Sequence, residues 1–290
     1  MSRMGRYEYL AKRYLRRCFQ SWNSRMSRFG RYEYNLKRML RRIFLITSSL
    51  IHLRDKTIDI IAGKHPDTNV FHHQWAMNRQ LMRFAKNYLP KIPNGSLVLD
   101  VGVGDAPYWH VRPDLDWQGL DVSEGKSVNF LITKGAAWPI QSNSFDVVLC
   151  TQVIEHTEEP AFLISEINRV LKPGGQIILN APFLYPFHGM PEDHMRYTKT
   201  QLEYFFKDFD ISECGILGGV GSSLATIYLN FINYTMSSNL FLQMLKVLFL
   251  PIWLLGNAIS NVLLVGLDRF DKTKSFPLNT YLIATTRQKA

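Results

Sequence analysis

The sequence predicts an α/β fold built on a doubly wound sheet, because short buried strands alternate with amphipathic helices. Residues 97–101 form a short apolar run that ends at Gly102, a pattern typical of a buried parallel strand that turns sharply into a loop. Residues 161–172 have the apolar spacing of a helix that stops at Pro173, and a second apolar run, residues 176–180, follows it. Strand and helix in this order predict a doubly wound sheet.

The composition is that of a folded protein. The chain has 290 residues, of which 46% are hydrophobic, enough to bury the core of one large or two small domains and to exclude disorder over most of the length. Cys18, Cys150 and Cys214 are too few and too scattered for a disulfide framework, so we expect a reducing compartment. The N-terminal residues lack the pattern of a secretory signal, so export is not expected.

Positive charge is concentrated in the first 44 residues. They hold 13 Lys and Arg against Glu8 and Glu33, whereas the formal net charge of the whole chain is +10. Residues 1–19 recur as residues 26–44, and each copy has the spacing of a basic amphipathic helix. This arm suits an anionic membrane, a nucleic acid, or packing against the rest of the chain as a solvated helix pair. The apolar run that continues at residues 43–46 favours the membrane. Translation could begin at Met1 or at Met26.

A nucleoside site is predicted where the first two strands end. The run 97–101 is followed by Gly102-Val-Gly104, and Asp121 closes a second short strand 21 residues after Asp100. Glycines let the backbone approach a ligand, and a carboxylate in this place accepts hydrogen bonds from ribose hydroxyls. The loop has no third glycine, which disfavours close contact with a pyrophosphate.

Four motifs in order resemble a known family. Residues 98–104, 119–121, 144–156 and 169–175 are similar to those of class I S-adenosylmethionine-dependent methyltransferases of the type 11 group. The resemblance covers roughly residues 97–209, with a last strand near 281–286. It implies a seven-stranded Rossmann-like sheet and S-adenosylmethionine as the cofactor.

The resemblance also implies which residues contact the cofactor. The glycines would line its methionine part, one acid would orient their loop, another would bind the ribose, and the residues after the fourth strand would flank the sulfonium. These candidates are Asp100, Gly102, Gly104, Asp121, Cys150, Thr151 and Gln152. Residues 133–140 lack the acid with which the family often binds the adenine amino group, so the sequence assigns no adenine contact.

No metal site is predicted. Related quinone-biosynthesis methyltransferases bind a metal through Glu-x-x-Glu-His, whereas this chain has Gln152 in place of the first carboxylate. Glu155 and His156 are therefore interpreted as a hydrogen-bonded pair at the start of a helix.

The segment after the fifth strand holds the candidate catalytic residues, because ligands of an open parallel sheet lie beyond the carboxyl ends of its strands. His188 is the predicted general base and His194 the second choice, with Asp193 and Arg196 positioning the substrate or the loop. The alternative is that these residues only brace the loop, with Arg196 paired to Asp193.

A long apolar insertion precedes the last strand. Residues 240–267 contain 20 apolar residues and a single charged one, Lys246. This segment is long enough to span a bilayer. Both ends must return to neighbouring strands, so a single crossing is excluded. The insertion is then a monotopic membrane insert, or else a soluble lid or a dimer contact.

The sequence therefore predicts a basic helical arm (1–53), a methyltransferase core (54–218), an apolar helical insert (219–275) and the last core strand (276–290). We expect an enzyme on the cytoplasmic face of a membrane that O-methylates a glycan, a lipid-linked sugar or another amphiphile, as in polysaccharide biosynthesis. The alternatives are RNA methylation guided by the arm and a non-catalytic scaffold that binds the cofactor. The acceptor and the oligomeric state are not predicted.

Overall fold

The computed structural model describes residues 30–189 and 192–287. Contacts divide the chain into two compact units, Met1–Lys56 and Thr57–Ala290. The described part of the first unit belongs to one long helix, α2 (Gly30–Ala62), which ends in the second unit. The second copy of the basic repeat is thus helical from Gly30 onward, as predicted, and the first copy lies outside the described residues.

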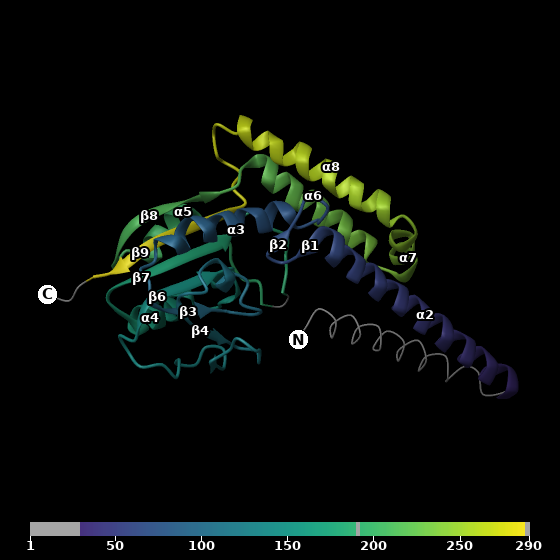
Figure 1. The fold of residues 1–290 in the computed structure, drawn as a ribbon, viewed down its shortest axis with the longest axis horizontal. Helices are drawn as coiled ribbons and strands as arrows, with labels where there is room; N and C mark the ends of the chain where they lie inside the picture. The colour runs from purple at the N-terminus through teal and green to yellow at the C-terminus, as the bar shows by residue number, and fades with distance from the viewer. Residues whose placement is uncertain (1–29, 190–191, 288–290) are drawn as a thin grey trace. The chain divides into compact units, whose positions relative to one another are not determined.

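The second unit is built on a seven-stranded sheet in the order β5-β4-β3-β6-β7-β9-β8 (Figure 1). All neighbouring pairs are parallel except those that involve β9, which runs antiparallel to both β7 and β8. The predicted doubly wound, seven-stranded fold is therefore confirmed, including the antiparallel last pair. The strands are β3 (Leu97–Val101), β4 (Asp116–Asp121), β5 (Phe130–Leu131), β6 (Phe145–Thr151), β7 (Leu171–Pro182), β8 (Phe209–Leu217) and β9 (Asn279–Thr286).

Helices cover both faces of this sheet. Apolar side chains of α3 (Trp75–Tyr88) pack with Val98, Val147 and neighbouring strand residues on one face. Those of α4 (Pro160–Val170) and α5 (Lys199–Phe205) pack on the other face, with Leu99 and Val148. Successive strand residues point to opposite faces, so two separate apolar layers result.

The alternation of strand and helix is less regular than predicted. Between β3 and β4 the only helical turn is η2 (Trp109–Val111), and β4 leads to β5 through bends and turns. The helix α4 ends at Val170, two residues earlier than expected, because Leu171 already pairs with Phe145 of β6. The remaining short elements are β1 (Gly63–Lys64), β2 (Asp67–Thr68), η1 (Leu89–Lys91), η3 (Ile154–His156) and η4 (Leu267–Phe270).

The apolar insertion forms three helices between β8 and β9: α6 (Val220–Met236), α7 (Leu240–Leu248) and α8 (Leu250–Gly266). The helices α6 and α8 lie side by side in Figure 1. The buried side-chain amides of Asn257 and Asn261 donate to backbone carbonyls of Phe71 and Val70, which ties α8 to the segment before α3. Residues Leu250–Phe270 are long and apolar enough to cross a membrane, and only 17% of the apolar window is buried.

Candidate functional site

The first part of the site is a glycine bend at the end of β3. Gly102 and Gly104 have φ angles of 70° and 51°, a left-handed conformation that side-chain-bearing residues rarely adopt. A Cβ on Gly102 would lie 2.4 Å from Cγ2 of Val153, so this position has no room for a side chain. A Cβ on Gly104 would meet no atom of the described residues within 4 Å, so they leave open space over the backbone there.

Asp121 joins this bend to the end of β4. Its Oδ2 accepts a hydrogen bond from the Gly104 N–H (3.0 Å), and its Oδ1 accepts one from the Ser123 N–H (2.9 Å). The two backbone donors hold the carboxylate in one orientation and leave each oxygen with a second lone pair. The side chain is half-buried.

Asp100 lies beneath the bend. Its carboxylate is buried, and burial, together with nearby Asp121, raises the pKa of Asp100 to about 7 although the Trp109 indole N–H donates to Oδ2 (2.9 Å). Trp109 belongs to the loop that follows the bend, so this hydrogen bond ties Asp100 to that loop. That Asp100 orients the glycines themselves stays a prediction. Whether this carboxylate also reaches a cofactor stays a prediction.

The three residues at the end of β6 differ in their environments. The Cys150 thiol is fully buried among core residues, and burial raises its pKa, so only its backbone faces the site. The Gln152 side-chain amide donates to Asn180 (2.8 Å) and Asn279 (3.2 Å), which ties it to β7 and β9. Thr151 is half-buried. That these residues flank the sulfonium therefore stays a prediction. Thr151 fits it best, because Cys150 is buried and Gln152 is bonded to other strands.

These residues fit S-adenosylmethionine. An open space over the glycine bend admits an extended ligand, and the oriented Asp121 carboxylate beside it can accept hydrogen bonds from a ribose. The Asp121 carboxylate also supplies negative charge that suits the ammonium and sulfonium groups of the cofactor.

The second part of the site is the loop after β7. The Arg196 guanidinium donates to Oδ2 of buried Asp193 (2.8 Å) and to the carbonyl of Met195 (2.9 Å). The His188 backbone N–H also donates to Asp193 (2.9 Å). Burial alone would raise the pKa of Asp193, but these donors hold it well below its usual range. All of these contacts are internal, so they favour the bracing role of Asp193 and Arg196 over contact with a substrate.

The same loop brings His188 to Glu155. Oε1 of Glu155 lies 3.6 Å from Nε2 of His156 and 3.9 Å from Nε2 of His188, and we call these three residues the acid–imidazole cluster. Glu155 is fully buried, and neither of its oxygens has a hydrogen-bond partner among the described residues. The predicted hydrogen bond between Glu155 and His156 is therefore wrong, because 3.6 Å exceeds hydrogen-bonding distance.

Burial shifts the pKa of every member of the acid–imidazole cluster. It raises the pKa of Glu155 to about 8 and lowers the pKa of both His156 and His188. His194 lies outside this cluster: its Nε2 is 3.9 Å from the carboxylates of both Glu158 and Glu192, in an exposed group of side chains. The sequence did not predict the cluster, since Glu155 and His188 are far apart in the chain. The sequence signals for it were the Glu155-His156 pair after one strand and the histidine-rich loop after the next.

Comparisons with known proteins point to one family. Residues 112–179 match the family model described as a methyltransferase domain. A tRNA (carboxymethyluridine(34)-5-O)-methyltransferase of Mus musculus is 30% identical over 32% of this chain and 15% of its own length. A demethylmenaquinone methyltransferase of Renibacterium salmoninarum is 30% identical over 45% of this chain and 59% of its own length. The chain thus spans less than two thirds of these relatives, and the family match leaves out both the glycine bend and the loop after β7.

Two solved structures are similar to parts of this chain. The [4+2]-cyclase SpnF matches with a TM-score of 0.49 and 18% identity, over 73% of this chain and 82% of its own. A SAM-dependent methyltransferase from Aquifex aeolicus matches with a TM-score of 0.38 and 18% identity, over 46% of this chain and 83% of its own. The motifs, the strand order and the family match together identify the core of this chain as a class I S-adenosylmethionine-dependent methyltransferase domain.

Proposed function

We propose that this protein transfers a methyl group from S-adenosylmethionine to an oxygen atom of an amphiphilic acceptor, such as a glycan or a lipid-linked sugar, at a membrane surface. The observation that carries the proposal is the position of the two parts of the site. The glycine bend with Asp121 and the acid–imidazole cluster both follow the carboxyl ends of parallel strands, where such sheets bind their ligands.

The chemistry is an in-line displacement. The cofactor supplies an electrophilic methyl group on its sulfonium. An acceptor oxygen forms the new bond to carbon, the carbon–sulfur bond breaks with its electron pair on sulfur, and the hydroxyl proton must leave. Alignment of the reacting atoms can supply about 7–11 kcal/mol of the barrier reduction. We assign removal of the proton to the acid–imidazole cluster, which includes His188, the predicted base.

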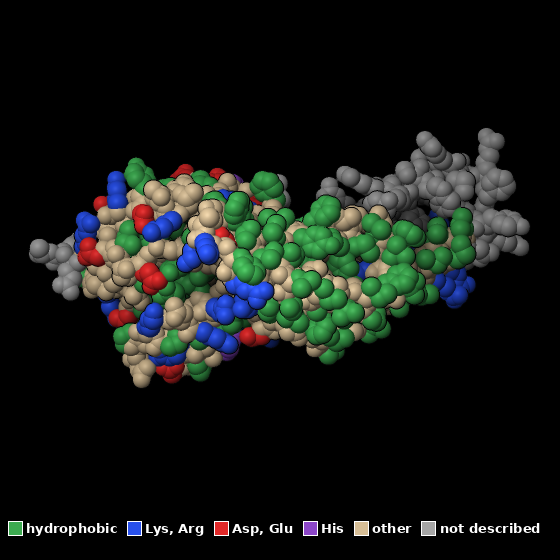
Figure 2. Space-filling view, turned by 90° about the horizontal axis from the view of Figure 1, so that it is seen from above, with side chains coloured by type: hydrophobic (Ala, Val, Ile, Leu, Met, Phe, Trp, Pro, Cys, Tyr) green, Lys and Arg blue, Asp and Glu red, His purple; other side chains and the backbone are tan. Residues whose placement is uncertain are grey.

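Exposed apolar surface on the insertion supports a membrane role. Large hydrophobic side chains gather over the helices α6–α8 (Figure 2), and such patches on soluble monomers are rarely so extensive. Because both ends of the insertion return to the sheet, it would enter one leaflet without crossing. The most exposed of these residues are Phe231, Phe241, Leu248, Ile252 and Leu263.

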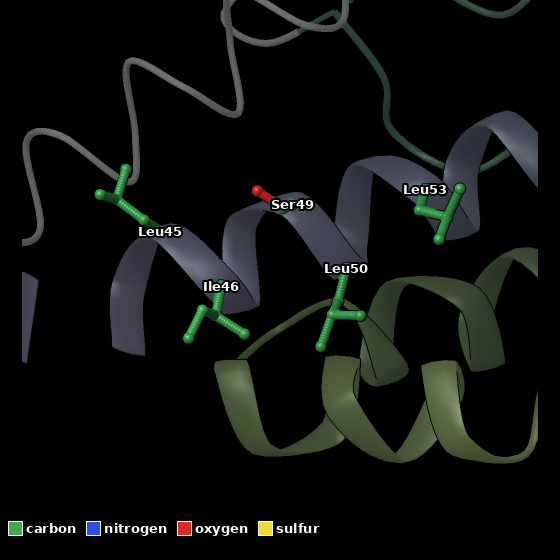
Figure 3. Close-up of a pocket in the computed structure, with 5 residues that line it drawn as sticks. All are labelled: Leu45, Ile46, Ser49, Leu50 and Leu53. Atoms are coloured by element: carbon green, nitrogen blue, oxygen red, sulfur yellow. The ribbon is translucent and has the colours of Figure 1, made fainter. Parts of the chain in front are cut away.

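The first unit offers a second membrane-binding feature by itself. On α2, Leu45, Ile46, Ser49, Leu50 and Leu53 line a shallow apolar hollow (Figure 3). Exposed Arg38, Arg41 and Arg42 precede it on the same helix. Each basic residue near an anionic leaflet contributes about 1 kcal/mol, so the arm and the insertion would bind together more tightly than either alone.

Flotation with lipid vesicles tests the membrane role. The full chain should float with vesicles of phosphatidylcholine and phosphatidylglycerol, and high salt should weaken but not abolish this. Replacing Phe241, Leu248 and Ile252 together by Ser should leave only salt-sensitive binding, whereas Leu131→Ser, which changes an exposed apolar residue on β5, should bind as the parent does. A chain that stays soluble and monodisperse without detergent and never floats would contradict the membrane role.

Labelled cofactor tests the activity. The chain is incubated with methyl-labelled S-adenosylmethionine and either a membrane-lipid extract or total RNA. Label in the lipid fraction, lost in Asp121→Ala, is expected. Label in RNA alone would favour the second candidate function, tRNA or other RNA methylation, to which the basic arm and the mouse relative point. Tight cofactor binding without methyl transfer to either fraction would contradict an enzyme and would indicate a scaffold that binds the cofactor.

A further inference from the structure

The acid–imidazole cluster has the geometry of a metal site. One possible ligand atom from each of Glu155, His156 and His188 lies within 4.8 Å of the other two. A tetrahedral ion with bonds of about 2.0–2.1 Å holds its ligand atoms about 3.4 Å apart, close to the observed 3.6 Å and 3.9 Å. We propose that these three residues bind one divalent transition-metal ion.

The outer nitrogens of both rings fix the tautomers. Nδ1 of His156 lies 2.5 Å from the Glu192 carbonyl oxygen, which can only accept, so Nδ1 carries the hydrogen. Nδ1 of His188 lies 3.3 Å from both the Pro186 carbonyl oxygen and an Asp193 carboxylate oxygen, which are also acceptors. In the neutral form of each ring, Nε2 is therefore a bare lone pair.

Two lone pairs and a carboxylate oxygen thus face one another, with Glu155 buried and both histidines partly exposed. Such atoms repel unless a positive charge lies between them. At 3.6 Å and 3.9 Å, a proton on Glu155 makes a hydrogen bond to neither imidazole, whereas one metal ion between the three atoms can bond to all of them. Glu155 supports this reading independently of the histidines, because it is 0% exposed and neither oxygen has a hydrogen-bond partner in the described chain.

The surroundings support the site as well. Metal-bound histidines donate their second N–H to a carbonyl or a carboxylate, which is the arrangement of both rings here. The His194 backbone N–H donates to the Glu155 carbonyl (2.9 Å), which fastens the loop to η3. A Cβ on Gly189 would lie 3.2 Å from Cε1 of His156, so a side chain at this position would press on that ring.

The ligand set indicates the kind of ion. Two imidazoles and one carboxylate suit Zn²⁺ and its neighbours such as Co²⁺ and Fe²⁺, whereas Mg²⁺ and Ca²⁺ prefer oxygen ligands. Three protein ligands also leave a coordination position open. The sequence argued against a metal because Gln152 replaces a carboxylate, and the structure supplies His188 in its place.

One consequence rests on the proposed function. A hydroxyl bound at the open position would be more acidic because of the positive charge, and its proton would pass to solvent water. His188 would then be a ligand and no longer the base itself. Metal binding, however, is measured without cofactor or acceptor, so its failure and the failure of methyl transfer are separate results.

Titration of the chelator-treated full chain with Co²⁺ tests the proposal. We expect one Co²⁺ per chain with visible d–d absorption, displaced by Zn²⁺ and unaffected by excess Mg²⁺. Loss of a supporting residue around a metal costs about 10–100-fold in affinity, so Glu155→Gln, His156→Ala and His188→Ala should each cost about 100-fold or more. His194→Ala removes a nearby imidazole outside the cluster and should bind Co²⁺ as the parent does.

Two results would overturn the proposal. One is the absence of stoichiometric Co²⁺ binding by the parent chain. The other is binding that His194→Ala removes and that His156→Ala and His188→Ala leave intact, which would place the ion at the exposed group of Glu158, Glu192 and His194. Unchanged circular dichroism and unchanged binding of S-adenosylhomocysteine show that a variant has kept its fold.

Discussion

The two parts of the site lie along one edge of the sheet, yet their carboxylates have different hydrogen-bond partners. Next to the glycine bend, Asp100 receives the indole N–H of Trp109, and Asp121 receives two backbone N–H groups. Across the edge, Glu155 faces two imidazole nitrogens and has no donor within the described residues. Asp100 and Glu155 are both buried, so the absence of a donor among the described residues, and not burial, sets Glu155 apart as the proposed metal ligand.

The largest effect is expected on cofactor affinity, which should depend on Asp121 and not on the acid–imidazole cluster. Asp121→Ala removes the carboxylate proposed to bind two ribose hydroxyls. A hydrogen bond to a charged group contributes about 1.5–3 kcal/mol, so affinity for S-adenosylhomocysteine should fall about 100-fold in calorimetry. Glu155→Gln and Asp210→Ala, which changes a surface carboxylate beside Arg287, should bind as the parent does. Equal losses in Asp121→Ala and Glu155→Gln would erase the distinction between the two parts.

The second effect concerns the bend itself. Gly102→Ala places a Cβ 2.4 Å from Val153 at a left-handed φ, so the free energy of unfolding should fall by roughly 2–3 kcal/mol in urea titrations. Gly104→Ala meets open space and should cost only about 1 kcal/mol of stability. Equal costs at the two positions would show that Val153 does not press on the bend.

The third effect depends on pH. The pKa of Asp100 is raised to about 7, so the folded state binds this proton more tightly than the unfolded state does. The protonated Asp100 carboxyl therefore contributes to the free energy of unfolding at low pH, and this contribution is lost as the pH rises towards the folded-state pKa. Asp100→Asn, which keeps an acceptor for Trp109, should lose less stability between about pH 5 and pH 8 when melting is measured without cofactor. Parallel curves for the two proteins would contradict the raised pKa.

The smallest effect is expected on the insertion. Phe241 is 70% exposed, so Phe241→Ser should change the free energy of unfolding by no more than about 0.5 kcal/mol. Asn261→Ala, in contrast, removes the donor to the Val70 and His72 carbonyls inside the protein, and should cost about 1–2 kcal/mol. A large loss in Phe241→Ser would indicate that this surface is covered by another copy of the chain.

The sequence was most informative where function depends on consecutive residues. Strand 97–101, the glycines after it and Asp121 form local patterns, so the sheet and its cofactor edge could be predicted. Local patterns could not reveal that β3 reaches β4 with only η2 between them, since the loop is held by contacts with residues before β3, such as those of Arg112 with the carbonyls of Leu89 and Ile92. Nor could they show the burial of the Cys150 thiol, which depends on helices packed from elsewhere.

The cluster was missed for the same reason. Glu155 and His188 meet because the loop after β7 is fastened by Arg196 to Asp193 and by Tyr197 to the carbonyl of Ile154 (3.2 Å). The residue types were visible in the sequence, but their distance was not. That His188 is the base, with His194 as second choice, stays a prediction until the variants are measured.

The position of β9 has a consequence for biosynthesis. This last strand lies between β7 and β8, so β8 cannot be joined to the rest of the sheet until the ribosome has made residue 286. The helices α6–α8 emerge before this strand. A nascent chain therefore exposes the apolar helices α6–α8 beside an incomplete sheet. A lipid leaflet or a chaperone that covers these helices first does so before the catalytic domain has folded.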